Sequence, residues 1–198
     1  RGLGDVYKRQ GRSWSVIGTV SHPPETAHRG LGEPHLVESI DGKLIGLFRV
    51  GGDDMENRFL YQSESNDGGY TWTPAQVTPM LGFPPHLTLL HDGRLLVVYG
   101  RRLHPFGERA CLSRDGGHTW DTWQKAYGPQ DRVYYFDLRV CGLGGDGVLA
   151  AYWTHDMINE KGLNVHTAVS SDQGRTWTEP LDASFWGQVT SVAALQSG

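Results

Sequence analysis

The chain has 198 residues, of which 38% are hydrophobic and 11% aromatic, enough apolar side chains for a core of ordinary size. Its 18 basic and 22 acidic residues give a formal net charge of −4, so it lacks the excess of positive charge that nucleic acid requires. No apolar run is long enough to span a bilayer. The composition argues against a nucleic-acid-binding or membrane-spanning protein, and its 27 glycines and 10 prolines favour a fold with many turns.

The first ten residues do not fit the pattern of the rest. A motif, S-x-D-x-G-x-x-W, recurs along the chain, and residues 11–14 (GRSW) match its second half. The Ser and Asp of that copy belong at positions 7 and 9, which are Tyr7 and Arg9. We therefore expect residues 1–10 to be a non-native junction sequence of the kind found at the ends of gene fragments, and residues 11–198 to form one partial domain.

The segment after residue 30 has the pattern of a β-hairpin followed by a third strand. Residues 33–49 read as a strand, a turn at Asp41-Gly42 and an apolar second strand. A polar loop at 51–58 then leads to a strand at 59–64. The almost continuous apolar run of the second strand is expected where a sheet is covered on both faces.

The same plan returns twice. Residues 84–112 repeat it around a turn at Asp92-Gly93, and residues 137–153 repeat it around Asp146-Gly147 with a looser first strand. Residues 185–196 read as the first strand of a further copy.

Each copy ends in the motif, a tight turn that leads into a fourth strand. At such a turn the Asp accepts hydrogen bonds from backbone N–H groups one to three residues further on, and the Ser adds a second side-chain bond. The Gly takes a positive φ and the Trp buries a large ring. The complete motifs recur about every 50 residues, a repeat-protein spacing, and comprise Ser65, Asp67, Gly69 and Trp72; Ser113, Asp115, Gly117 and Trp120; and Ser170, Asp172, Gly174 and Trp177.

These boxes resemble the Asp-box, or BNR repeat, of the sialidase (neuraminidase) superfamily, whose catalytic domain is a six-bladed β-propeller. The resemblance covers residues 11–198 and implies an all-β fold of four-stranded antiparallel blades, three to four of which lie in this chain. In that family the boxes are structural and lie away from the active site. Because such an arc leaves blade faces uncovered, we expect the chain alone to be inactive and not to form a compact monomer.

In an up-and-down blade the Asp-Gly turn and the Asp-box turn lie at one end, so we expect the chemistry at the opposite end. Arg49 and Arg101 each end an apolar second strand at places that the alignment makes equivalent, and their guanidinium groups suit a sugar carboxylate. Sialidases bind the substrate carboxylate with three arginines, so the resemblance implies the same role. The alternative is that each arginine only pairs with an acid on an adjacent loop. Further substrate-binding candidates at this end are Arg58, His86, Asp137 and His155.

Three carboxyl groups at this end are candidate catalytic residues. Asp53 and Asp54 lie in the loop where the resemblance places the general acid/base, although acid-rich loops are often only solvated. The family's first arginine opens a first strand in an R-I-P motif, whereas the matching residues here are Gly32-Glu33-Pro34. Glu33 would suit a neutral-sugar glycosidase with two carboxylates, or would simply bond to a neighbouring loop.

Tyr135 is a candidate nucleophile. It lies with Tyr134 in the crossing into the third repeat, and the family's nucleophile is a Tyr activated by a Glu. Packing of both rings in the core is the alternative.

The sequence and the resemblance together predict a sialidase-like exo-glycosidase that acts on terminal sugars of glycoconjugates, sialic acid among them. The alternatives are a propeller hydrolase or lyase for another sugar, and a non-catalytic propeller that binds glycan or protein. Enzymes of this family that act on polymeric glycans tend to be exported, which favours an extracellular or periplasmic location.

We expect carbohydrate as the partner, with no cofactor and no metal. His104, His155 and His166 lack metal-ligand spacing. Cys111 and Cys141 fall in apolar segments, which favours two buried thiols over a disulfide.

Overall fold

The computed structural model describes residues 15–26, 28–52, 55–104, 106–121, 124–127, 133–156, 161–179 and 181–186. This part of the chain forms twelve β-strands and two 3-10 helices, η1 (Pro24–Thr26) and η2 (Met55–Asn57). The strands are β1 (Leu31–Glu38), β2 (Leu44–Val50), β3 (Phe59–Ser65), β4 (Gln76–Leu81), β5 (Pro85–Leu89), β6 (Leu95–Arg101), β7 (Gly107–Ser113), β8 (Gln124–Tyr127), β9 (Val133–Gly144), β10 (Gly147–Asp156), β11 (Lys161–Ser170) and β12 (Leu181–Trp186).

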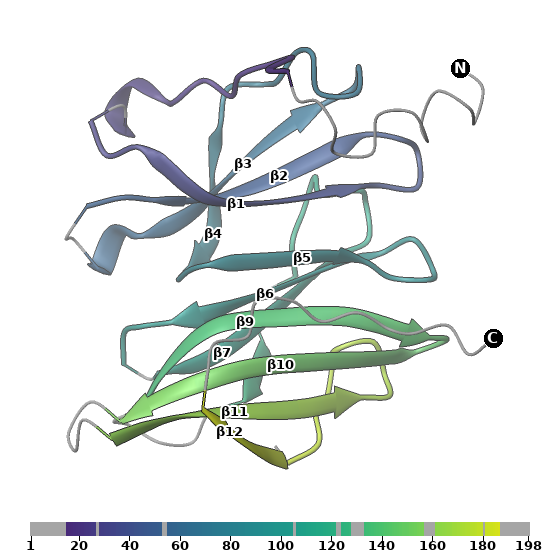
Figure 1. The fold of residues 1–198 in the computed structure, drawn as a ribbon. Helices are drawn as coiled ribbons and strands as arrows, with labels where there is room; N and C mark the ends of the chain where they lie inside the picture. The colour runs from purple at the N-terminus through teal and green to yellow at the C-terminus, as the bar shows by residue number, and fades with distance from the viewer. Residues whose placement is uncertain are drawn as a thin grey trace.

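The strands form three antiparallel sheets of four consecutive strands each, stacked one upon another (Figure 1). We call them blade 1 (β1 to β4), blade 2 (β5 to β8) and blade 3 (β9 to β12). The first strands of neighbouring blades lie next to one another, because β5 contacts both β1 and β9. We call β1, β5 and β9 the central strands. The predicted fold is therefore confirmed: the described residues form three blades of a β-propeller.

Two strand boundaries differ from the prediction. β9 begins at Val133, so Tyr134 and Tyr135 lie inside the first strand of blade 3 rather than in the crossing before it. Phe185 and Trp186 end β12, the fourth strand of blade 3, and do not begin a new blade. Every fourth strand starts four residues after its box Trp, and a strand pattern by itself does not show which blade it joins.

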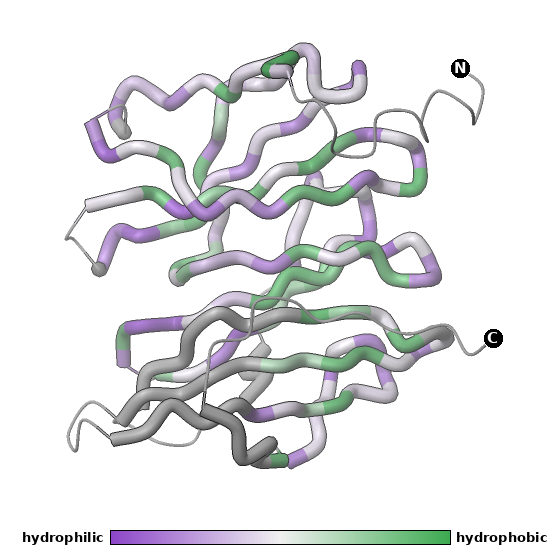
Figure 2. Tube along the Cα trace, in the orientation of Figure 1, coloured by the Kyte–Doolittle hydropathy of each residue, from purple (hydrophilic) through white to green (hydrophobic). Residues whose placement is uncertain are grey.

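β6 shows why the second strands are continuously apolar. Its side chains alternate between two cores: Leu95, Val97 and Tyr99 join the cluster shared with blade 1, while Leu96 and Val98 join the cluster shared with blade 3. All five are at most 1% exposed. Figure 2 shows this apolar colouring along β6, in the middle of the stack. The middle blade therefore has a buried face on each side, which identifies the stacking of blades as the source of its core.

The three box turns share one set of hydrogen bonds made by their Ser and Asp side chains. In the second, the N–H of Gly117 donates to Ser113 Oγ (2.8 Å), and the Ser113 hydroxyl donates to Asp115 Oδ1 (2.8 Å). The N–H and the hydroxyl of Thr119 donate to Asp115 at 2.8 and 2.5 Å. The predicted role of the Ser is confirmed, but the main backbone donor to the Asp lies four residues on, because the turn is wider than expected. The Asp thus also fixes a threonine that the motif does not specify.

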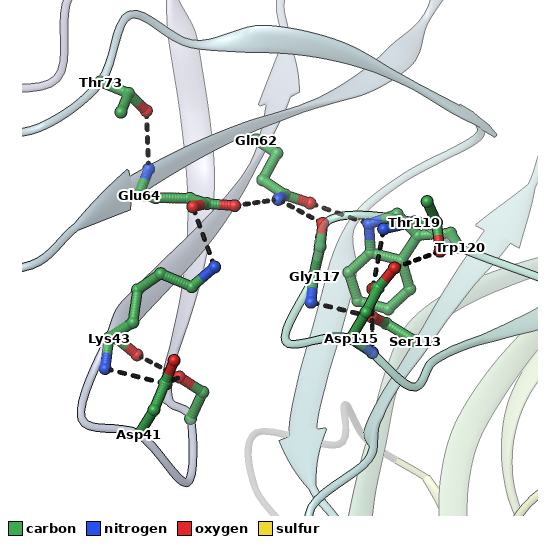
Figure 3. A network of polar contacts seen from close by, with 11 residues as sticks. Asp41, Lys43, Gln62, Glu64, Thr73, Ser113, Asp115, Gly117, Thr119 and Trp120 are labelled. Atoms are coloured by element: carbon green, nitrogen blue, oxygen red, sulfur yellow. Dashed lines mark hydrogen bonds and ion pairs between the residues drawn. The ribbon is translucent and has the colours of Figure 1, made fainter.

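Gln62 on β3 joins blade 1 to the box of blade 2 (Figure 3). Its Oε1 accepts from Trp120 Nε1 (2.8 Å), and its Nε2 donates to the carbonyl of Gly117 (2.8 Å) and to Glu64 (2.9 Å). Glu64 in turn pairs with the buried Lys43 at 3.0 Å. In the other two boxes the indole N–H bonds directly to the box Gly carbonyl at 3.0 Å. Gln62 replaces that bond with one that crosses between blades.

Both cysteines are free thiols. Cys111 is buried beside Tyr99, with the hydroxyl and the sulfur 3.8 Å apart, and Cys141 is half-buried. Burial raises the pKa of the Cys111 thiol to about 11, which keeps it protonated and unreactive. The preference for thiols over a disulfide is confirmed, although only Cys111 is fully buried.

Gln62→Ala should weaken the contact between blades 1 and 2. It leaves the Trp120 indole N–H and the Gly117 carbonyl without their partner, so we expect the free energy of unfolding to fall by about 1 to 3 kcal/mol. Gln76→Ala, at an exposed position of β4, is the control and should stay within about 0.5 kcal/mol of the parent. Denaturant unfolding of the complete protein measures both, and equal effects would show that the Gln62 contacts contribute nothing.

The box aspartates should make stability fall in acid. Hydrogen bonds from the Thr71 side chain and backbone lower the pKa of Asp67 to about 2. Burial acts to raise the pKa of Asp115, but the hydrogen bonds from Thr119 and Ser113 outweigh it and lower that pKa to about 2 as well. A carboxyl pKa that is lower in the folded state stabilises the protein above its unfolded pKa of about 4, and this stabilisation is lost as the pH falls toward 2.

Melting temperatures between pH 7 and pH 2 measure this loss. Asp115→Asn, which does not titrate, should show a shallower fall in this window than the parent. A parallel decline in the two proteins would refute the role of this carboxylate.

Candidate functional site

Three connections meet at the end of the blades opposite the boxes. They join β2 to β3, β4 to β5 and β6 to β7, whereas the Asp-Gly turns and the boxes occupy the other end. The strand order thus places the ends of β2 and β6 beside the start of β3 and β5. This is the end at which sequence predicts the chemistry.

Phe83, in the connection from β4 to β5, is the centre of a group of arginines. Its ring is only 2% exposed, and three guanidinium carbons lie over it: Arg49 at 4.4 Å, Arg58 at 4.9 Å and Arg102 at 4.3 Å. All three distances are within the range of a cation–π contact. One aromatic ring therefore contacts three positive charges, one from strand β2 and two from separate loops. We call these four residues the arginine cluster.

Backbone contacts fix the position of the Phe83 ring. The N–H of Phe83 donates to the carbonyl of Gly100 (2.9 Å), and that of Gly82 donates to the carbonyl of Arg58 (3.1 Å). Gly82 has a φ of 152°, and a Cβ there would lie 2.4 Å from the Gly100 oxygen. Only glycine allows the chain to pass this close to β6, so the Gly-Phe sequence is what places the ring.

Glu33 faces the arginine cluster from β1. Its Oε1 is 2.5 Å from Arg49 Nη1, and both side chains are partly exposed. Glu33 and Pro34 form a β-bulge opposite Phe48, and Glu33 has a φ of 46°. A left-handed backbone at a residue other than glycine costs about 1 to 3 kcal/mol. The bulge turns the Glu33 carboxylate toward Arg49. Arg49 thus pairs with an acid, as the alternative prediction for this arginine states.

A second bulge occupies the same place in blade 3. There Asp137 and Leu138 stand opposite Tyr152, between the pairs Phe136 with Trp153 and Arg139 with Ala151. The structure describes only the backbone of Asp137. Glu33 and Asp137 are therefore equivalent in register, and blade 2 has Pro84 at the corresponding position.

Arg101 is not equivalent to Arg49. Arg49 is eight residues after Asp41, and the residue eight after Asp92 is Gly100. Because side chains alternate along a strand, this shift of one residue turns Arg101 to the other face. Its Nη2 donates to the carbonyl of His104 at 3.4 Å, and the following residue, Arg102, reaches Phe83 instead. The predicted equivalence was wrong by one position.

Arg58 and His86 both contact residues of other elements: Arg58 stacks on Phe83, and His86 bonds to blade 3. Arg58 is 9% exposed, and no described residue accepts a hydrogen bond from its Nε. His86 Nδ1 accepts from the N–H of Val140 in blade 3 (3.2 Å), and His35 Nδ1 accepts from Leu87 in blade 2 (3.2 Å). The two imidazole rings lie 3.9 Å apart. His86 is thus part of the contact between central strands, and its role toward a substrate stays a prediction.

The remaining predicted site residues are only partly placed. Asp53 and Asp54 lie outside the described residues. Tyr135 pairs in register with Thr154, and His155 pairs with Tyr134, on the paired strands β9 and β10. These four residues stay predictions. Phe83 was not predicted, and Arg102 was expected at this end of the blades but not selected as a binding residue. The available signals were the run Gly-Phe-Pro-Pro between two strands and the Arg101-Arg102 pair.

The two cavities described lie away from the arginine cluster, at the contacts between blades. One of about 560 Å³ borders the boxes of blades 2 and 3, and one of about 300 Å³ borders Gln62 and Gly117. No three His, Cys, Asp or Glu side chains in the described ranges are grouped so as to hold a metal ion. That same part of the chain has no helix with the length and hydrophobicity of a membrane span.

A family model described as a BNR repeat-like domain matches residues 5–144. The chain belongs to this family. Membership accounts for the recurring boxes and for the propeller blades that they close. No curated protein sequence matches the chain.

Several solved structures share the BNR fold of this chain at low sequence identity. They include an α-L-arabinanase from Penicillium chrysogenum complexed with arabinobiose (TM-score 0.64, 15% identity, 86% of this chain and 54% of that one). They also include a PL25 ulvan lyase bound to -[GlcA(1-4)Rha3S]- (TM-score 0.61, 13%, 83% and 46%) and the sialidase NanB with Optactamide (TM-score 0.61, 12%, 85% and 40%). This chain spans about half the length of these structures, and the likeness shows the fold alone.

Phe83→Leu tests the stacking in the arginine cluster. The change keeps apolar bulk but removes the π-face, so we expect the free energy of unfolding to fall by about 2 to 3 kcal/mol, of which about 1 is lost packing. Phe48→Leu is the matched control, since Phe48 is buried without an arginine among its described ring contacts, and should cost about 1 kcal/mol. Chemical denaturation of the complete protein measures both, and equal costs would contradict stacking.

Proposed function

We propose that this chain is part of a propeller glycosidase whose arginine cluster binds the anionic group of an acidic terminal sugar. The observation that carries the proposal is the convergence of Arg49, Arg58 and Arg102 on Phe83. A guanidinium group that stacks on a ring uses its flat face, and its N–H donors remain in its plane, where they match the two oxygens of a carboxylate.

The similar structures include enzymes for acidic sugars and enzymes for neutral sugars, and they do not select between the two classes. The ulvan lyase is bound to a saccharide with a glucuronic acid unit, and NanB is a sialidase, whereas the arabinanase binds arabinobiose. The R-I-P arginine of sialidases is absent from Gly32-Glu33-Pro34. Because the arginine cluster is cationic, we propose a sugar carboxylate as the recognised group, with sialic acid and uronic acids as the two classes to compare.

Glycosidases need a proton donor as well as a binding group. In this proposal Asp53 or Asp54 protonates the leaving glycosidic oxygen, and Tyr135 is the candidate nucleophile. Glu33 would orient Arg49 through their ion pair while the other N–H donors of Arg49 face the substrate.

A second function is favoured by the paired bulges of blades 1 and 3. Glu33 and Asp137 occupy equivalent positions on central strands, as two catalytic carboxylates would. In that case the enzyme acts on a neutral sugar, with one carboxyl group as acid and the other as base or nucleophile.

The two proposals differ in which variant loses activity on which substrate. We would measure kcat/KM of the complete protein on aryl sialosides, glucuronides and arabinofuranosides. If the arginine cluster binds the substrate anion, Arg49→Lys, which keeps the charge beside Glu33, should lower kcat/KM on the acidic substrate about 30- to 1000-fold, equivalent to about 2 to 4 kcal/mol. Lys43→Gln, at the box end of blade 1, should leave that value unchanged.

Turnover of the neutral substrate alone, abolished by Glu33→Gln, would favour the two-carboxylate enzyme. Binding of glycans without turnover of any substrate would favour a non-catalytic propeller. Either result overturns the acidic-sugar glycosidase.

A further inference from the structure

The 560 Å³ cavity lies between blades 2 and 3 at the box end, far along the strands from the arginine cluster. Three arginines and three aspartates line it, so their formal charges cancel. Such a lining offers hydrogen-bond donors and acceptors together and has no preference for an ion of either sign. The charged residues are Arg94, Arg114, Arg175, Asp92, Asp146 and Asp172.

Arg94 differs from its counterpart in blade 1. The equivalent residue, Lys43, is neutralised by Glu64, but the residue that corresponds to Glu64 in blade 2 is Leu112. Arg94 pairs instead with Asp92 of its own turn at 2.7 Å. Its Nη1 is buried and has no hydrogen-bond partner among the described residues. Arg94 is a lining residue of the cavity, and a buried donor without a partner gains free energy when a ligand supplies an acceptor.

Gln173 supplies an acceptor at the same cavity. The first two boxes have glycine at this position, Gly68 and Gly116, whereas Gln173 adopts a φ of 62°. Its amide nitrogen donates to Asp146 and its backbone N–H donates to the Asp146 carbonyl (2.9 Å), which fixes the orientation of the amide group. Gln173 is only 9% exposed, and its Oε1 is buried without a hydrogen-bond partner in the part of the chain that is described.

We propose that this cavity is a second saccharide-binding site, which takes a neutral sugar unit through vicinal hydroxyl groups. A hydroxyl group both accepts and donates, so in this proposal a diol offers an acceptor to Arg94 and a donor to Gln173. A simple anion accepts only, and would leave Gln173 Oε1 without a donor. The strained Gln173 conformation is consistent with a residue kept for binding rather than for the turn. The site is independent of the catalytic proposal, because it lies at the opposite end of the blades.

Indole N–H signals in the NMR spectrum of the complete protein report on the site. Trp177 Nε1 bonds to the carbonyl of Gly174, beside Gln173, and Trp72 Nε1 makes the same 3.0 Å bond in box 1. Titration with arabinobiose or maltose should shift the Trp177 signal saturably, with a Kd of about 0.1 to 10 mM, and leave the Trp72 signal in place. Sodium sulfate should shift neither.

Matched variants locate the binding. Gln173→Gly restores the residue of the other two boxes, and Arg94→Gln removes the guanidinium group; each should weaken disaccharide binding at least tenfold. Lys43→Gln, at the equivalent position of blade 1, should leave the Kd unchanged. A Trp177 signal that does not respond up to 50 mM sugar, that responds to sulfate instead, or that responds equally in Gln173→Gly would overturn the proposal.

Discussion

Burial of both faces of the middle blade is the constraint on which the arrangement of the three blades depends. The side chains of β6 alternate between the core shared with blade 1 and the core shared with blade 3, and none of its apolar residues is exposed. Removal of apolar surface from water is the main favourable term in folding, so these two shared cores hold the blades to one another. Polar groups at the two ends of the strands must then satisfy their hydrogen bonds within the contact between blades.

At the box end this requirement is met differently at the two contacts between blades. Between blades 1 and 2, Gln62 satisfies an indole N–H and a carbonyl group, and Glu64 neutralises Lys43. Between blades 2 and 3, Leu112 replaces that glutamate, Arg94 pairs with Asp92 of its own turn, and the cavity of about 560 Å³ lies beside them. The two contacts therefore differ through a change at one equivalent position, Glu64 in blade 1 and Leu112 in blade 2.

The sequence was sufficient to predict the fold because the box is a local signal. Ser113, Asp115 and Gly117 bond to one another within one turn, so their spacing alone implies the turn, and its recurrence implies blades. The arginine cluster is not local: Arg49 comes from strand β2, Arg58 and Arg102 come from two loops, and the three meet at Phe83. Sequence reasoning found the first two and chose Arg101 over Arg102, because an alignment error of one residue reverses the face of a strand. The left-handed backbone of Glu33 had no signal in the sequence.

The arginine cluster also explains how one rigid scaffold holds charges of like sign together. Guanidinium groups repel one another, and the partial burial of Arg58 adds a desolvation cost. The quadrupole of the Phe83 ring offsets part of that cost by presenting electron density to each group, and Glu33 offsets more at Arg49. Because these interactions occupy the face of the ring and one edge of one guanidinium group, they position the arginines without saturating the donors of Arg49 and Arg58. An anion bound at this end would then gain preorganised donors whose mutual repulsion the fold has already overcome.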